Sequence, residues 1–117
     1  MEANINKSLD VVAIVGSLRA GSLTRRVVIA LAGIMRDTLT IEIVEIGSLP
    51  LYNQDGETAP SAAWSEFRAR IKRADAILFA TPEYNRSVPG GLKNAIDVGS
   101  RPNAAAGGVH RPRRQIP

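Results

Sequence analysis

The chain has 117 residues, enough for at most one domain. Its composition, 44% hydrophobic and 22% charged, is that of a globular protein, and it contains no cysteine. Disulfides, thiolate catalysis and zinc–thiolate sites are therefore excluded. The single histidine, His110, lies in an irregular C-terminal stretch, so neither imidazole catalysis nor a metal site is expected.

The net charge of +4 comes from the C-terminal stretch and does not indicate a nucleic-acid-binding surface. Residues 102–117 hold Arg111, Arg113 and Arg114 and no acidic residue. Without these three arginines, the basic and acidic residues of the chain nearly balance, so nucleic acid is not an expected partner. The N-terminus is polar and no apolar run is long enough to span a membrane, so we expect a cytoplasmic protein without membrane contact.

The first predicted strand and helix flank a short polar turn. Leu9 to Gly16 is a nearly continuous apolar run rich in valine and isoleucine, which predicts a central parallel strand. After the turn, Ser22 is the expected N-cap of a helix, in which Gly33 would allow close packing on the sheet. The apolar stripe of this helix is expected to consist of Val27, Val28, Leu31, Ile34 and Met35.

A second strand and helix are predicted further along the chain. Thr40 to Ile46 mixes apolar residues with two glutamates, which favours a strand at a sheet edge. After a turn-rich loop, Ser61 is expected to cap a helix. Its buried side is predicted to carry Trp64, Phe67, Ile71 and Ala74, and its outer side Arg68, Arg70, Lys72 and Arg73.

The third repeat of the pattern completes a β-α-β-α-β-α order. Asp75 to Thr81 is apolar and predicts a central strand, and Gly90 and Gly91 open a helix whose Leu92, Ala95 and Ile96 face inward. This order predicts an α/β fold with a parallel sheet and right-handed crossovers. Ligands of such sheets bind beyond the carboxyl ends of the strands, where two polar turns of this chain lie.

The first of these turns, between Gly16 and Ser22, has the residues of an anion site. A helix N-terminus offers free N–H groups and a partial positive charge, to which Ser17, Ser22 and Thr24 add hydroxyls and Arg19 a guanidinium. The alternative is an ordinary N-cap with a solvated arginine. Neither the dinucleotide fingerprint nor the P-loop pattern is present, so the turn favours a monophosphate.

The second turn follows the third strand directly. Tyr84 offers a flat face to a planar ring, and Asn85 and the loop N–H groups offer hydrogen bonds to it. Pro82 stiffens the loop and lowers the entropy lost on binding. Arg86 and Ser87 are placed to reach the ligand or a partner subunit. The alternative interpretation is a polar loop in which Tyr84 packs locally.

These two stretches resemble the NADPH-dependent FMN reductase family, which includes quinone and chromate reductases. Pro82 to Asp97 matches the family pattern P-E-Y-N-x-S-x-P-G-x-L-K-N-A-I-D at every specified position. The first stretch matches G-S-L-R-x-x-S-x-N-R, except that Thr24 replaces the usual asparagine. The resemblance covers roughly residues 9–101. It implies an incomplete flavodoxin-like three-layer α/β fold of about three strands and three helices.

The resemblance also implies a cofactor and an activity. The FMN phosphate would lie on Ser17, Arg19, Ser22 and Thr24, and the isoalloxazine ring would be bordered by Pro82, Glu83, Tyr84 and Asn85. NAD(P)H would be the co-substrate, a quinone or another small molecule the electron acceptor, and a homodimer or homotetramer the assembly. No catalytic side chain is nominated, because the flavin supplies the reactive atom. Two alternatives stay open: a flavodoxin-type electron carrier, and a non-enzymatic remnant that acts by association.

The resemblance ends after Arg101. We therefore expect residues 1–101 to form a partial FMN-binding domain and residues 102–117 a disordered tail, as if the family's C-terminal half were truncated. The composition of the tail resembles translation in a wrong reading frame. A third strand without its neighbour would leave an apolar edge, so we expect poor solubility or partial order and weak FMN binding.

Overall fold

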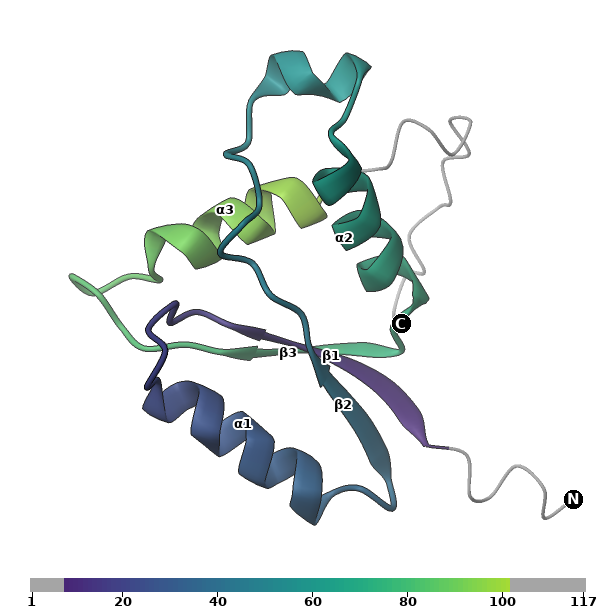
Figure 1. Ribbon diagram of the computed structural model, residues 1–117, viewed down its shortest axis with the longest axis vertical. Helices are drawn as coiled ribbons and strands as arrows, with labels where there is room; N and C mark the ends of the chain where they lie inside the picture. Colours follow the sequence, from purple (N-terminus) through teal and green to yellow (C-terminus); the bar gives the residue numbers. More distant parts are fainter. Residues whose placement is uncertain (1–7, 102–117) are drawn as a thin grey trace, which may run out of the picture.

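The computed structural model describes residues 8–101 (Figure 1). The predicted tail, 102–117, lies outside the described residues. Within residues 8–101 no helix combines the length and apolar character needed to cross a lipid bilayer. The elements in chain order are β1 (Leu9–Val15), α1 (Leu23–Ile34), β2 (Leu39–Ile43), the 3₁₀ helix η2 (Gln54–Thr58), α2 (Ala62–Arg73), β3 (Ala76–Ala80) and α3 (Gly90–Gly99).

The three strands form a parallel sheet in the order β2-β1-β3. The prediction that β1 is central and β2 an edge is confirmed, and Val11 to Val15 of β1 are all buried. β2 ends earlier than predicted, at Ile43. The Val44 N–H still donates to the Ala13 carbonyl at 3.0 Å, but Val44 and Ile46 join the core beneath α2 and α3. β3, predicted as central, is the other edge of the described sheet.

Helices cover both faces of the sheet, which gives three layers (Figure 1). On one face, Val12 and Ile14 of β1 pack with Trp64 and Phe67 of α2 and with α3. On the other face, Ala13 and Val15 pack against Val28 of α1. The alternation of β1 side chains between the two cores follows from the two-residue period of a strand. The predicted α/β architecture is thus confirmed.

The prediction for the apolar stripe of α1 is partly wrong. Val28 is buried, but Val27 is 65% and Ile34 78% exposed. Both lie at the margin of the stripe, and a sheet of three strands is too narrow to cover the whole of it. Gly33 is exposed, and a side chain placed there would meet nothing within 4 Å, so the expected close packing at Gly33 is also wrong.

Arg68 is a further correction, because this predicted surface residue is only 4% exposed. Its Nε donates to the carbonyl of Val98 at 2.8 Å, and its Nη2 bonds to Glu57 at 2.7 Å. The guanidinium also lies over the ring of Trp64, with its Cζ 5.2 Å from the ring centroid. Paired in this way, the buried charge connects α2, α3 and η2.

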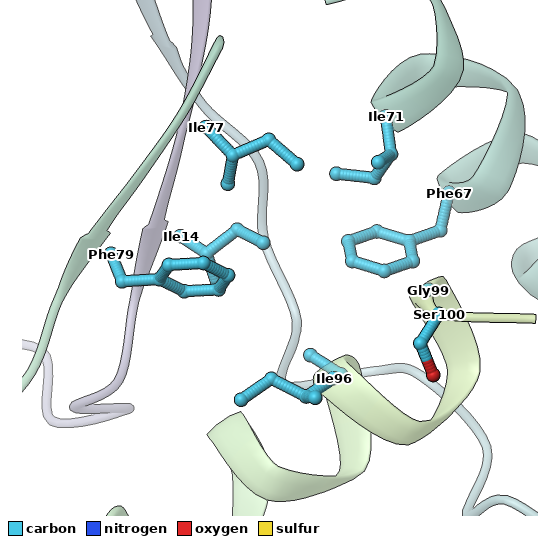
Figure 2. Close-up of a pocket in the computed structure, with 9 residues that line it drawn as sticks. Ile14, Phe67, Ile71, Ile77, Phe79, Ile96, Gly99 and Ser100 are labelled. Atoms are coloured by element: carbon cyan, nitrogen blue, oxygen red, sulfur yellow. The ribbon is translucent and has the colours of Figure 1, made fainter. Parts of the chain in front are cut away.

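β3 borders an open apolar hollow of about 200 Å³. Figure 2 shows Ile14, Ile77 and Phe79 of the sheet facing Phe67 and Ile71 of α2, with Ile96 of α3 below them. Ile96, expected to face inward, is 37% exposed here, and Phe79 is 51% exposed. The Gly16 N–H donates to the Ala80 carbonyl, so by alternation the N–H and C=O groups of Ile77 and Phe79 point to the open side of β3.

Asp10 and Arg70 connect β1 to α2, and their ion pair predicts a pH dependence of stability. Arg70 donates two hydrogen bonds to the carboxylate, at 2.7 and 3.0 Å, which lowers the pKa of Asp10. A carboxyl with a lowered pKa stabilises the fold above its unfolded-state pKa of about 3.9, and this contribution is lost as the pH falls through the folded-state value.

We expect Asp10→Asn to lower the urea midpoint at about pH 6 and the difference from wild type to shrink towards about pH 3. Asp37→Asn, which removes an exposed carboxylate with no ion pair among the described residues, is the control; a constant difference at both pH values would contradict the assignment.

The exposed apolar edge predicts association of the chain. We expect Phe79→Lys to reduce light scattering at a fixed protein concentration, because a lysine at an edge strand opposes further strand pairing. Val27→Lys is the matched control, since Val27 is 65% exposed but belongs to α1, on the other face of the sheet. Equal scattering by the two variants would show that the β3 edge does not drive association.

Candidate functional site

The two polar turns leave the sheet at the same edge, side by side. Val15 and Ala80, the last residues of β1 and β3, are register partners, and the Gly16 N–H donates to the Ala80 carbonyl at 2.8 Å. The next residues of each strand enter the two loops that the sequence singled out. In Figure 1 both loops lie at the left end of the sheet, between the strands and the start of α1 and α3. The predicted convergence at one rim is confirmed.

Gly16 is a glycine because the loops approach closely. A Cβ atom at this position would lie 2.5 Å from Thr81 Oγ1 and 2.9 Å from Thr81 Cβ. No side chain fits that space without moving the backbone of one loop, so glycine sets the spacing of the two loops. The sequence showed Gly16 only as flexible backbone, and its contact with Thr81 was missed, since the two are far apart along the chain.

The first loop presents the N-terminus of α1 to solvent. Ser22 is buried and caps the helix, accepting a hydrogen bond from the Arg25 N–H at 3.1 Å. Ser17 accepts one from the Arg19 N–H at 3.4 Å, and both hydroxyls keep a proton to donate. The N–H groups of Leu23 and Thr24 have no partner within the described residues, as expected in the first turn of a helix. These donors converge at the positive end of the helix dipole.

Arg19 is the free cation of this loop. It is exposed and forms no ion pair with another residue in the range 8–101. Arg25, in the first turn of α1, is instead bonded to Glu45, which raises the pKa of Arg25. A guanidinium with its fork of donors unengaged can take a phosphate through two hydrogen bonds. Arg19 therefore has the charge and freedom that the predicted anion site requires.

The second loop is a hairpin turn with unusual backbone angles. The N–H of Tyr84 donates to the Ser87 carbonyl at 2.9 Å, and the Ser87 N–H returns a bond to Tyr84 at 3.0 Å. Asn85 and Arg86, between them, have φ of 53° and 63°. Positive φ at both central residues is the requirement of a type I′ turn, in which asparagine followed by glycine is favoured. The arginine at the second position costs about 1–2 kcal/mol relative to glycine.

The remaining residues predicted to line a ring lie on the same loop. Pro82 is half-buried, and its carbonyl accepts a hydrogen bond from Thr81 Oγ1 at 2.7 Å. Glu83 and Asn85 are exposed, and Tyr84 is 51% exposed, so the local packing that was the alternative for Tyr84 covers only half of this residue. The loop thus offers a flat aromatic surface and backbone polar groups beside the first loop.

Helix α3 makes two contacts that the sequence did not predict, one with the first loop and one with the segment after β2. Leu18 lies against Gly91, where an added Cβ would be 3.2 Å from Leu18 Cδ1, so the start of α3 also touches the first loop. Asn94 of α3 accepts a hydrogen bond from the Tyr52 N–H at 2.7 Å and donates to the Pro50 carbonyl at 3.2 Å. The only sign of the Asn94 hydrogen bonds in the sequence was the place of this polar residue between Leu92 and Ala95, which are buried.

A parallel sheet with helices on both faces, in which a polar loop leads from the first strand into the first helix, is the arrangement of a flavodoxin-like α/β protein. The NADPH-dependent FMN reductase family model matches residues 9–113. The chain belongs to this family. The solved flavoenzyme NAD(P)H:acceptor oxidoreductase FerB from Paracoccus denitrificans has a similar structure, with a TM-score of 0.76 and 40% sequence identity over 82% of this chain and 53% of FerB.

Curated relatives agree with this assignment. A quinone reductase of Pseudomonas putida is 60% identical over 94 residues, which cover 80% of this chain and 50% of that protein. The 2-hydroxy-1,4-benzoquinone reductase of a Burkholderia species is 43% identical over 95 residues, covering 81% of this chain and 52% of the relative. The chain thus spans about half the length of the curated relatives it matches.

The contact between Gly16 and Thr81 predicts that Gly16→Ala and Gly33→Ala change the stability of the chain in opposite directions. We expect Gly16→Ala to lower the melting temperature and to weaken binding at the rim, because the added Cβ forces the two loops apart. Gly33→Ala adds the same methyl group to an exposed helical position with open space around it, and should stabilise the chain by roughly 1 kcal/mol. Circular dichroism melts of both variants test this. A Gly16→Ala variant as stable as wild type would mean that the loops are not tightly coupled.

Proposed function

We propose that this chain forms the FMN-binding part of an NAD(P)H-dependent oxidoreductase whose electron acceptor is a quinone. The observation that carries the proposal is the convergence of the two loops. The first loop provides donors for a phosphate, and the second provides a surface for a planar ring. A ligand with both groups, such as FMN, would engage both loops together.

The phosphate end of FMN fits the donors of the first loop. Ser17 and Ser22 have hydroxyl protons to donate, the first turn of α1 has free N–H groups, and Arg19 has an unengaged guanidinium. A phosphate monoester needs this mixture of backbone, hydroxyl and guanidinium donors. Thr24, in the first turn of α1, adds a further hydroxyl to the set in place of the usual asparagine.

The ring end fits the second loop. Tyr84 is half-exposed at the rim, and the turn that follows it is closed by two backbone hydrogen bonds, which hold the loop in shape before anything binds. A preformed loop loses less entropy on binding than a mobile one. Pro82, Glu83 and Asn85 would then border the ring on the side of β3.

The chain supplies position and charge, and the cofactor supplies the redox chemistry. When bound, FMN would accept a hydride from NAD(P)H and pass electrons to the quinone. No cysteine or histidine lies among the described residues of the rim, so no side chain is assigned a nucleophilic or imidazole role. The residues named here would bind and orient the flavin.

The resemblance to the family supports a further part of the proposal, a homo-oligomer (dimer or tetramer), and a cytoplasmic location is proposed with it. The quinone acceptor is supported by the names of the relatives from Pseudomonas putida and Burkholderia. Steady oxidation of NADPH by the FMN-loaded chain with an added quinone distinguishes this activity from that of a flavodoxin-type electron carrier, which would not turn over.

Arg19→Ala is the direct test of the phosphate site. We expect the dissociation constant for FMN to rise about tenfold or more, because a charge-assisted, two-point contact is lost. Riboflavin, which lacks the phosphate, should bind wild type and variant equally. Quenching of flavin fluorescence on titration with protein gives both constants.

Arg36→Ala is the matched control, since it removes the same charge from an exposed position just beyond the other end of α1. The control should keep the wild-type affinity for FMN. If Arg19→Ala and Arg36→Ala weaken FMN binding equally, the effect is one of net charge, and the phosphate does not lie at Arg19.

A further inference from the structure

Arg86 adopts an unfavourable backbone conformation in a turn whose two ends are both packed against the first loop. Its φ of 63° is in the left-handed region, where glycine is the favoured residue of a type I′ turn. Thr81, before the turn, lies against Gly16, and Gly91, after it, lies against Leu18. The turn therefore projects from a base that is held against the first loop. A non-glycine residue retained in such a conformation points to a function for its side chain.

The side chain of Arg86 is free to bind an anion. It is exposed and forms no ion pair with any residue from 8 to 101, whereas Arg25, Arg68 and Arg70 are all engaged by carboxylates. The sequence pattern already marked this position as one that could reach the ligand. Arg86 and Arg19 are thus two free guanidinium groups on neighbouring loops of one rim, and a single FMN has only one phosphate.

We infer that Arg86 binds a phosphate group of the dinucleotide co-substrate. This inference rests on the proposed function, in which NAD(P)H must approach the flavin from the solvent side of the same rim. The dinucleotide has two sources of phosphate, the pyrophosphate of both NADH and NADPH and the 2′-phosphate of NADPH alone. A guanidinium matches either by a forked pair of hydrogen bonds. Its place at the tip of the turn, beyond Tyr84, suits a group that extends away from the ring.

Arg86→Gly is the informative substitution because it removes the guanidinium and suits the turn. We expect its melting temperature to be equal to or above that of wild type, so that lost binding cannot be attributed to unfolding. Isothermal titration of the full chain, saturated with FMN, with NADP⁺ and with NAD⁺ measures the effect. The dissociation constant for NADP⁺ should rise about tenfold or more, and the constant for FMN should stay unchanged. Arg86→Lys keeps a single charge and should recover part of the affinity.

The two phosphate sources give different patterns. A loss confined to NADP⁺, reproduced with adenosine 2′,5′-bisphosphate, assigns Arg86 to the 2′-phosphate. An equal loss for NADP⁺ and NAD⁺, reproduced with ADP, assigns it to the pyrophosphate. If Arg86→Gly leaves the affinities for both dinucleotides unchanged, the inference is overturned while the flavin site stands. The inference is also overturned if Arg86→Gly weakens the binding of FMN but not that of the dinucleotides. A wild-type chain that binds neither FMN nor NADP⁺ overturns the proposed function and this inference with it.

Discussion

The candidate site depends on how closely the ends of β1 and β3 approach one another. A single backbone hydrogen bond, from Gly16 to Ala80, closes the ladder at the point where both strands enter their loops. The absence of a side chain at Gly16 then lets the loops meet at Thr81. Because parallel strands end at the same edge of a sheet, one contact between neighbouring strands places the loop proposed to bind the phosphate next to the loop proposed to line the ring.

The other parts of the described fold serve this arrangement by keeping β1 in the centre. Its side chains enter two cores, one beneath α1 and one beneath α2 and α3. Arg70 holds α2 to the beginning of β1 and to Glu42 of β2, while Asn94 ties α3 to the segment after β2. The open apolar edge at β3 lies on the side away from β1, so both loops of the rim are present within residues 8–101 even though that edge is uncovered.

Sequence reasoning predicted the order of elements, both loops and their common rim, because short apolar runs, capping serines and loop motifs are local signals. It failed where the determinant is not local. Arg68 was assigned to the surface by its charge, yet its partners, Glu57 and the Val98 carbonyl, lie on other elements. Val27 fits the helical period but is exposed, since periodicity does not reveal how wide the sheet is. The backbone of Arg86 contradicts its intrinsic preference, and only the three-dimensional turn shows it.

The central claim is that one flavin engages both loops at once. The most direct measurement is a titration of the isotope-labelled chain with FMN, followed by the backbone amide signals in NMR. We expect the amide signals of residues 17–24 and 83–86 to shift together with a single midpoint, and inorganic phosphate to shift only the first group. Shifts confined to one loop, or centred on the apolar hollow beside Phe79, would contradict it.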